Sequence, residues 1–479
     1  MKSLFKNSLY NIIYKLFMMA FPLVSSAYVS RILLPEGVGK VAYAQNIASY
    51  FITIAGLGIG SYGVREIGKN QKNKIQYSKT VVELLIITLI STFICSIIYY
   101  GMVCSFPYFL SNRSLYYAVG IQLVLTAANV DWFYQGMEEY GYITARSLII
   151  KILTLLGILV FVKSKNDLVP YALLSSIALA GNNIINVIHL KKYLVKFDIS
   201  KIKLKQHIKP LLVLLSTGFA IELYTKLDTT TLGIFTSETC VGYYNYATKI
   251  TSIVVNLAAS VSTILLPRFS LYREQNMLDE LKKTIESAQS VILFIAIPSA
   301  IGIIIMAKDI IFFLFGEAFI PAAATVQILA VLVIIKSIGN LYGVQVLVAF
   351  GKEKTLFYTT VLGAISNVLM NITLIPVFQQ NGAAIASVLS ELAVCIYQYI
   401  AAHRQINAEL DKRDLYKMII ATTVMAVIVY VIVHIVSNTI IAIIFSCLVG
   451  VGVYFIVTFL LHVKTSIQIL NKIRSVLNF

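Results

Sequence analysis

Long apolar stretches recur along the whole of this 479-residue chain, and they constrain its fold more than any motif does. A stretch of about 20 apolar residues is long enough to cross the hydrocarbon core of a bilayer as a helix. Hydrophobic residues make up 58% of the sequence and charged residues only 13%, a balance that a water-soluble domain of this size cannot bury. The sequence therefore predicts an all-α polytopic membrane protein.

The apolar stretches divide the chain into about fourteen segments, each close to the roughly 20 residues that one membrane-spanning helix requires. Pro22 and Pro298 fall inside the first and ninth segments, where proline is expected to kink a helix rather than end it. The expected spans are residues 10–33, 40–61, 80–104, 115–136, 142–162, 168–190, 210–235, 240–265, 287–307, 321–347, 356–377, 382–402, 416–436 and 438–462.

Basic residues gather in alternate connections between these spans. Both ends of the chain and the connections near residues 65–79, 191–209, 268–283, 352–354 and 404–417 are rich in lysine and arginine, whereas the connections between them carry few. Because loops on the cytoplasmic side of a membrane carry an excess of these residues, both termini are predicted to be cytoplasmic. The same asymmetry accounts for most of the net charge of +17, so no nucleic-acid partner is expected.

A short repeat indicates a duplicated architecture. Residues 38–47 read VGKVAYAQNI, and residues 241–250, which begin 203 positions later, read VGYYNYATKI, with five of the ten positions identical. Six spans separate the copies, so both enter the membrane in the same direction, as in a parallel repeat. We expect two pseudo-symmetric six-helix lobes around a central cavity: residues 1–192 and 210–404, joined by a basic cytoplasmic tether at 193–209 and followed by two further helices and a cytoplasmic tail at 405–479.

The stretch from residue 209 to residue 250 carries charges inside predicted spans. Glu222 and Lys226 are four residues apart, so they share one helix face and can pair, whereas Asp228 points to nearly the opposite side. Lys249 lies about halfway along the next span, too deep for its side chain to reach the surface. A charge at this depth costs about 2.5–3.5 kcal/mol on insertion scales. Two interpretations stay open: one neutralised pair with an aspartate near the outer end, or the polar lining of a transport path.

Six further charged residues lie within predicted spans or at their ends: Arg31, Asp131, Arg146, Lys151, Lys336 and Glu391. For Arg31, Asp131 and Arg146, interfacial anchoring is the alternative to a role in transport. Cations outnumber anions at depth, which favours an anionic substrate such as a phosphate or pyrophosphate. The candidate substrate-binding residues are Arg31, Arg146, Lys151, Lys226, Lys249 and Lys336, and the candidate coupling residues, whose carboxylates can change charge, are Asp131, Glu222, Asp228 and Glu391.

Several motifs, in order along the chain, resemble one family. They include SRILLPEGVGKVAYAQNIASYF (30–51), NVDWFYQGMEEYGYITARS (129–147), KLDTTTLGIFTSETCVGYYNYATKI (226–250) and NGAAIASVLSE (381–391). Together they are similar to the Wzx-type O-antigen and polysaccharide flippases, a branch of the multidrug/oligosaccharidyl-lipid/polysaccharide exporter superfamily. The resemblance implies a V-shaped cavity between two lobes, the bacterial inner membrane as location, and translocation of undecaprenyl-pyrophosphate-linked oligosaccharide to the outer leaflet.

The resemblance also implies functional positions and partners. Where the family often has a basic residue after the aspartate of the seventh span, this chain has Thr229, which leaves the partner of Asp228 open. The implied partners are the lipid-linked glycan, membrane lipid, and polymerase and chain-length proteins of the same pathway. The positions carried over at matching motifs are Arg31, Asp131, Trp132, Arg146, Asp228 and Lys249. For Trp132, anchoring at the membrane interface is the commoner role of a tryptophan.

Two other functions were weighed against a flippase. A drug or cation exporter of the same superfamily would need an acidic, aromatic cavity, and the excess of deep cations argues against it. A membrane enzyme such as a glycan polymerase or ligase would need positioned catalytic groups, and no paired carboxylates or Ser/His pairing appears. The five cysteines and five histidines are scattered, with no spacing that suggests a metal site, a disulfide framework or a bound cofactor.

Overall fold

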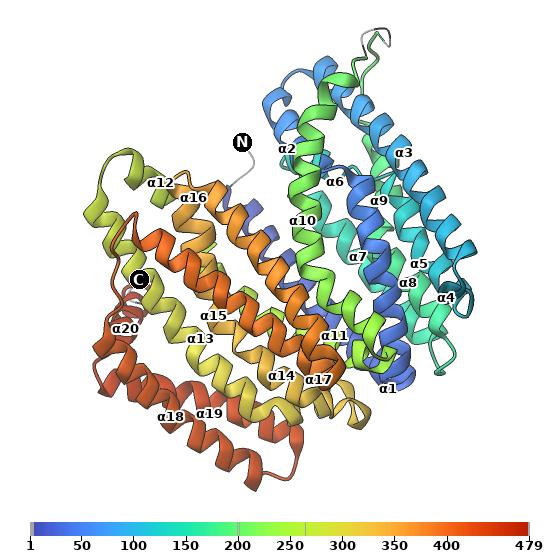
Figure 1. Cartoon of the computed structure of the whole chain (residues 1–479). Helices are drawn as coiled ribbons and strands as arrows, with labels where there is room; N and C mark the ends of the chain where they lie inside the picture. The colour runs from blue at the N-terminus through green and yellow to red at the C-terminus, as the bar shows by residue number, and fades with distance from the viewer. Residues whose placement is uncertain (1–3, 199, 201, 264, 478–479) are drawn as a thin grey trace. The chain divides into compact units, whose positions relative to one another are not determined.

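The computed structural model is built from helices throughout, in agreement with the predicted all-α membrane fold (Figure 1). It describes residues 4–477 except 199, 201 and 264, and it describes side chains for residues 21–471 except 199, 201, 261, 263 and 264. The chain divides into two compact units, residues 1–233 and residues 234–479.

The first unit is organised around its first helix. Helix α1 packs against α3, α5, α7 and α8, and α2 packs against α3 and α6. The helices are α1 (Leu4–Gly56), α2 (Ile59–Asn70), α3 (Lys74–Ser105), α4 (Pro107–Leu110), α5 (Arg113–Thr126), α6 (Asp131–Gly136), α7 (Tyr140–Phe161), α8 (Leu168–Ala180), α9 (Asn182–Leu190) and α10 (Lys205–Phe235), whose last two residues belong to the second unit.

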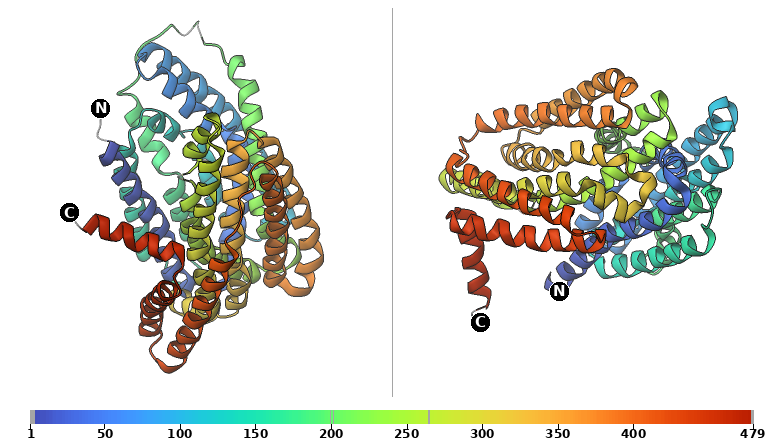
Figure 2. Two further views of the ribbon diagram at one scale, coloured as in Figure 1. Left: turned by 90° about the vertical axis from the view of Figure 1, so that its left-hand side faces the viewer. Right: turned by 90° about the horizontal axis from the view of Figure 1, so that it is seen from below.

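The second unit is organised around α13, which packs against α11, α14, α15, α18 and α19. Helices α18 and α19 lie side by side, as the red ribbons in Figure 2 show. The elements are α11 (Glu238–Thr263), α12 (Leu266–Glu274), α13 (Leu278–Phe315), the 3-10 turn η2 (Glu317–Phe319), α14 (Ala322–Ala330), α15 (Leu332–Gly339), the π-helix η3 (Asn340–Val346), α16 (Leu347–Ala349), α17 (Glu353–His403), α18 (Lys412–Ile435), α19 (Thr439–Leu460) and α20 (Lys464–Leu477).

Ten helical stretches of the described residues are long and apolar enough to cross a membrane. Two of them carry a break: Leu34, with φ 60° and ψ 174°, interrupts α1 before Pro35, and Gln379, with φ 51° and ψ −130°, interrupts α17. Both breaks fall between predicted spans. Counting the halves separately, and adding α5 with α6 and α11, gives the fourteen predicted segments within the described residues. The prediction of a multi-pass helical fold is therefore confirmed.

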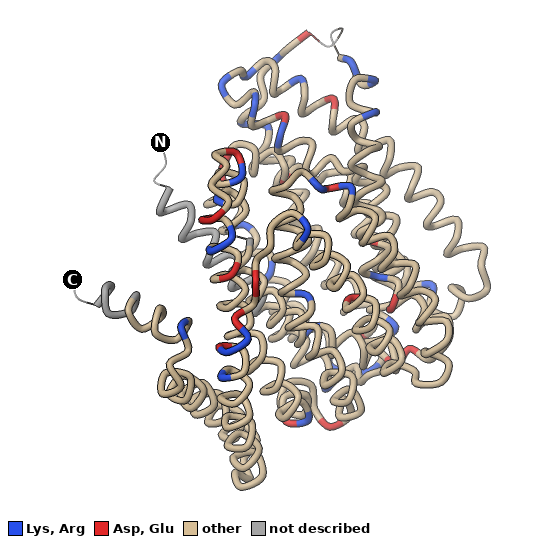
Figure 3. The backbone as a smooth tube through the Cα atoms, turned by 60° about the vertical axis from the view of Figure 1, so that its left-hand side comes forward, with Lys and Arg blue, Asp and Glu red and all other residues tan. Residues whose placement is uncertain are grey.

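Charged residues cluster near the ends of many helices, although several lie within them (Figure 3). Helix α18 begins with Lys412, Arg413, Asp414 and Lys417 and then continues without a charge, and α19 has no charged residue at all. This distribution is the one expected of helices whose middle portions lie in hydrocarbon.

The boundary between the two compact units lies at residue 233, whereas the sequence predicted that the second lobe begins at residue 210. Helix α10 contacts α1 of its own unit: the Nδ2 of Asn46 donates to the Oγ1 of Thr230 at 2.7 Å, and the ring of Tyr50 packs edge-on against Phe219. The division into six-helix lobes and the central cavity stay predictions.

Candidate functional site

A buried arginine forms the most complete charged group among the predicted site residues. Arg146, from α7, is 5% exposed, and its Nη2 lies 3.0 Å from the Oδ1 of Asp131 at the start of α6. Its Nη1 donates to the Oδ1 of Asn186 in α9, and the Nδ2 of Asn186 donates in turn to Asp131. Three helices thus meet in a closed ring of two charges and one amide, which neutralises a cation that burial would otherwise penalise strongly.

Aromatic rings surround this group. The guanidinium of Arg146 lies 5.4 Å from the ring centre of Tyr142, and the ring of His189 stacks on Tyr142 at 4.2 Å. The Nε of Arg146 and the hydroxyl of Tyr142 are buried without a hydrogen-bond partner among the described protein groups. A water molecule or a ligand oxygen could satisfy both groups, so this site has capacity for one more acceptor.

Lys151 lies further along α7 and is 5% exposed. Its ammonium lies 5.0 Å from the ring centre of Phe21. No carboxylate is paired with it within the described part of the chain. A cation–π contact compensates for only part of the lost hydration of an ammonium, so the charged form of Lys151 is incompletely compensated by the protein groups described.

Three predicted residues lie along α10. Asp228 is 9% exposed, and Glu222 and Lys226 are half-buried. The ion pair that the spacing of Glu222 and Lys226 allows is not formed among the described residues, so the interpretation as one neutralised pair gains no support. The helix instead makes its polar contacts one turn further on, where the hydroxyl of Thr230 lies 2.7 Å from both Asn46 and Tyr50.

Two further predicted cations take different positions. Lys249, in α11, is half-buried, with its ammonium 4.5 Å from the ring centre of Tyr246. Arg31, in α1, is exposed, and its Nη1 donates to the backbone oxygen of Ala27 at 2.5 Å. The sequence repeat aligns the buried Asn46 of the first unit with Lys249 of the second.

In the second unit, Lys336 of α15 and Glu391 of α17 form an ion pair. The sequence alone does not indicate that these two residues pair. The Nζ of Lys336 lies 3.0 Å from the Oε1 of Glu391, and the two side chains are 40% and 16% exposed. Because Lys336 is well exposed, it remains accessible to a ligand while it neutralises the carboxylate.

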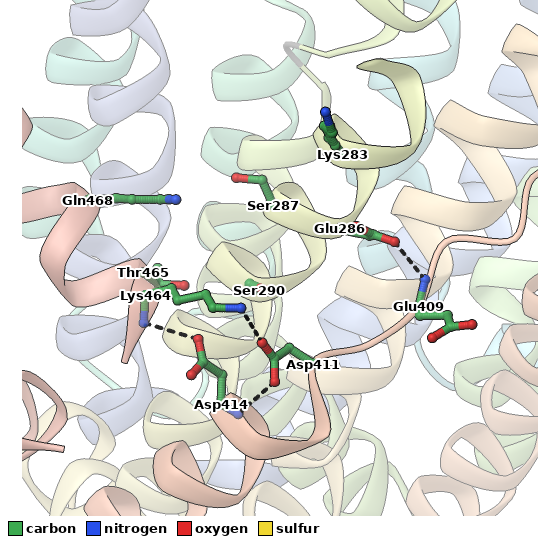
Figure 4. Close-up of a pocket in the computed structure, with 10 residues that line it drawn as sticks. All are labelled: Lys283, Glu286, Ser287, Ser290, Glu409, Asp411, Asp414, Lys464, Thr465 and Gln468. Carbon is green, nitrogen blue, oxygen red and sulfur yellow. Dashed lines mark hydrogen bonds and ion pairs between the residues drawn. The ribbon is translucent and has the colours of Figure 1, made fainter. Parts of the chain in front are cut away.

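A polar cavity of about 220 Å³ lies at the beginning of α18 and α20 (Figure 4). Asp411 accepts from Lys464 at 2.6 Å and caps the first amides of α18, and Asp414 accepts from the backbone amide of Lys464 at 3.0 Å. The contact with the Lys464 ammonium and the helix amides hold the pKa of Asp411 below its usual range. These carboxylates already have partners, so we assign the cavity a structural role.

Sequence reasoning missed one polar position, Asn186, because an asparagine in an apolar helix carries no signal of which helix it will face. Trp132 is 2% exposed and packs on Gly63, where a Cβ atom would lie 2.3 Å from the indole, so its ring is buried within the first unit. No group of histidine, cysteine, aspartate or glutamate suited to a metal ion occurs in the described part of the chain.

Helices long and apolar enough to cross a membrane many times, with charged residues held inside them, define a polytopic membrane protein. The model of the polysaccharide biosynthesis protein family matches residues 4–272, and the chain belongs to this family. The predicted family is therefore confirmed.

Individual relatives agree with this assignment. A protein of Escherichia coli K12 named "Putative O-antigen transporter" is 25% identical over 390 residues, which cover 78% of this chain and 90% of the relative. The structure of the lipid II flippase MurJ in an inward closed conformation has a TM-score of 0.75 with 16% identity, covering 94% of this chain and 98% of MurJ. An inward-facing multidrug transporter of the MATE family, in the MOP superfamily, has a TM-score of 0.63 with 14% identity, covering 81% and 94%. The relatives are transporters and flippases, which confirms the prediction of a transporter rather than an enzyme.

Proposed function

We propose that this protein is a flippase for lipid-linked oligosaccharide, the O-antigen or capsule repeat unit carried on undecaprenyl pyrophosphate. It moves this substrate from the cytoplasmic to the outer leaflet of the bacterial inner membrane by alternating access, with both termini in the cytoplasm. Ion or proton movement supplies the driving force.

One observation carries the proposal: the match to an O-antigen transporter extends over 78% of this chain, within a family of polysaccharide biosynthesis proteins. The buried cations support it. Arg146 and Lys151 are each 5% exposed and both come from α7. Groups of this kind suit a diphosphate, because they can exchange their internal contacts for bonds to phosphate oxygens.

The roles of individual residues follow from their positions. Arg146, Lys151, Lys226, Lys249 and Lys336 bind the diphosphate or nearby anionic groups at successive stages, and Arg31 binds it at the end of the first span. The carboxylates of Asp131, Glu222, Asp228 and Glu391 are the groups whose protonation or ion binding couples to the cycle.

Cell-surface glycan display in a strain that lacks its own flippase tests this function. The full chain is expected to restore display, and Lys249→Ala and Asp228→Ala are each expected to reduce it by tenfold or more at normal expression. Lys412→Ala, at the exposed beginning of α18, is a matched control that should leave display unchanged. Wild-type display in both test variants would remove these residues from the mechanism.

Export of cationic drugs is the competing function, since the fold also resembles a multidrug transporter. The two are separated by expressing the chain in cells without drug exporters and measuring the accumulation of a cationic dye. A flippase leaves the dye concentration unchanged and depletes the inner-leaflet pool of lipid-linked glycan.

A further inference from the structure

A glutamate buried in the first unit is contacted by four groups, three hydrogen-bond partners and one lysine ammonium. Glu83, in α3, is 1% exposed. Its Oε1 accepts from the backbone amide of Lys203 at 2.6 Å, and its Oε2 lies 2.9 Å from the Nε2 of His207 and 3.3 Å from the amide nitrogen of Gln206. The ammonium of Lys79 lies 3.7 Å away. In the sequence, Glu83 lies about one turn from the basic residues 65–79, a position that by itself indicates only an interfacial charge.

His207 continues the chain of contacts to a third helix. It is 4% exposed, and its Nδ1 lies 2.8 Å from the hydroxyl of Tyr62 in α2. A carboxylate can only accept, so the Nε2 beside Glu83 carries a hydrogen. In the neutral ring, Nδ1 then accepts from the Tyr62 hydroxyl. In the protonated ring, Nδ1 donates to the oxygen of Tyr62. The same three side chains therefore accommodate both protonation states, with only the Tyr62 hydroxyl hydrogen turning.

Helix α10, which these contacts hold, is less buried by the rest of the protein than the other candidate spans are. Only 6% of the most apolar stretch of α10 is buried, against 22% to 50% in the other nine candidate spans of the described residues. Along its length, α10 has a second polar attachment at Thr230, which contacts Asn46 and Tyr50. At the beginning of α10, Leu211 also packs in the apolar cluster that holds Tyr62 of α2 and Leu84 of α3, so the Glu83–His207 contact adds a polar attachment to an apolar one.

We propose that Glu83, His207 and Tyr62 form a proton-binding site whose occupancy sets how firmly α10 is attached to α2 and α3. This inference deepens the proposed function, on which it rests, by placing a coupling site away from the deep carboxylates. The ligand is a proton, bound by His207 between the carboxylate and the phenol. Protonation of His207 turns its hydrogen bond to the Glu83 carboxylate into an ion pair between opposite charges, which is stronger in a buried site. Loss of the proton loosens the helix.

The charges around the site are consistent with reversible protonation. From α3, Lys79 faces Glu83 and remains 18% exposed, so it can turn toward solvent when His207 becomes cationic. From α2, the guanidinium of Arg65 lies 5.2 Å from the ring centre of Tyr62, and Glu66 neutralises it at 3.3 Å. From α10, Lys205 and Lys209 are exposed. A histidine is the side chain that exchanges protons near neutral pH, where a coupling site must work.

Hydrogen–deuterium exchange of the full chain in lipid nanodiscs tests the site without any substrate. The backbone amides of residues 202–212 are compared at about pH 6 and about pH 8, after correction for intrinsic exchange. Protection is expected to be roughly fivefold to tenfold higher at the lower pH, because protonated His207 adds an attraction between opposite charges to its hydrogen bond with the Glu83 carboxylate. The amide of Lys203, which donates to Glu83, reports on the site directly.

Three variants make the test decisive. His207→Gln is expected to abolish the pH dependence, and Glu83→Gln provides a second way to abolish it if the first variant does not fold. His434→Gln replaces an exposed histidine of α18 and should behave as the wild type. Equal protection at the two pH values in the wild type, or an unchanged pH dependence in His207→Gln or Glu83→Gln, overturns the proposal. A chain that shows the pH dependence and yet moves no lipid-linked glycan keeps the proton site and overturns the proposed function instead.

Discussion

The two charged pairs found in the spanning helices differ in how they are enclosed. In the first unit, Arg146 has a 4% exposed side chain and shares Asp131 with a bridging asparagine. In the second unit, Lys336 has a 40% exposed side chain and makes one contact, to Glu391. The first arrangement joins three helices around the cation. The second leaves the cation accessible. Charge type and depth are similar in the two, so the packing of neighbouring helices decides whether a deep cation is enclosed or accessible.

The largest expected effect comes from removing the carboxylate in the enclosed group. Asp131→Ala leaves the buried guanidinium of Arg146 without its counter-charge, and because the Asp131 side chain is 36% exposed, the expected cost lies toward the lower end of the about 3–5 kcal/mol of unfolding free energy for a fully buried pair. Equilibrium unfolding in detergent micelles measures it, with Asp279→Ala, an exposed carboxylate of α13, as the control. The double variant Asp131→Ala with Arg146→Met should recover much of the loss. If the single variant is as stable as the wild type, the contrast between the two pairs is wrong.

A smaller effect is expected from the bridging amide. Asn186→Ala removes one acceptor from Arg146 and one donor to Asp131 while the direct ion pair remains, so the expected cost is about 1–3 kcal/mol of unfolding free energy. The same unfolding measurement applies. Asn129→Ala, whose side chain accepts from the backbone amide of Asp131 at 3.2 Å, is the control, because it borders the group without joining it to α9. A loss equal to that of Asp131→Ala would mean that the ion pair between Arg146 and Asp131 does not persist without Asn186.

The difference between the two pairs shows what the sequence can predict. The spans followed from apolar length, and the interruptions at Leu34 and Gln379 lie where LLPEG and QQNG separate two apolar stretches. The depth of Arg146 and Lys336 along their helices was also predictable, since depth depends on position in one helix alone. Which helix lies opposite each residue depends on tertiary packing, which no periodicity encodes.

Glu83 illustrates the same limit. Its position one turn from a basic loop indicated a surface charge, and the structure buries it because the connection at Lys203 and the first turn of α10 fold back over it. A buried carboxylate needs several donors. Those donors come from residues about 120 positions further along the chain, so no local sequence pattern predicts them.

The exposed pair in the second unit should matter little for stability. Lys336→Gln is expected to change the unfolding free energy by less than about 1 kcal/mol, the usual range for a pair in contact with water. Under the proposed function, it should nonetheless reduce glycan display several-fold, and the two measurements are made on the same variant. A large loss of stability would place this pair in a dry environment like that of Arg146 and remove the contrast between them.

The smallest effect concerns a third pair, outside the spanning segments, where Asp411 contacts Lys464 at 2.6 Å and joins the beginning of α18 to α20. The contact with Lys464 lowers the pKa of Asp411 from its ordinary value of 3.8, and the contact with Asp411 raises the pKa of Lys464. A carboxyl group whose pKa is lower in the folded state stabilises the fold above its unfolded pKa, and the contribution is lost as the pH falls through the folded value. The attachment of α20 should therefore weaken only below about pH 4. Hydrogen–deuterium exchange of residues 464–471 should show this loosening at low pH in the wild type and at all pH values in Asp411→Asn. Added salt should weaken the attachment as well, since this pair lies in water and is screened. An attachment that withstands both acid and salt would show that apolar packing of α20, rather than this pair, holds the helix in place.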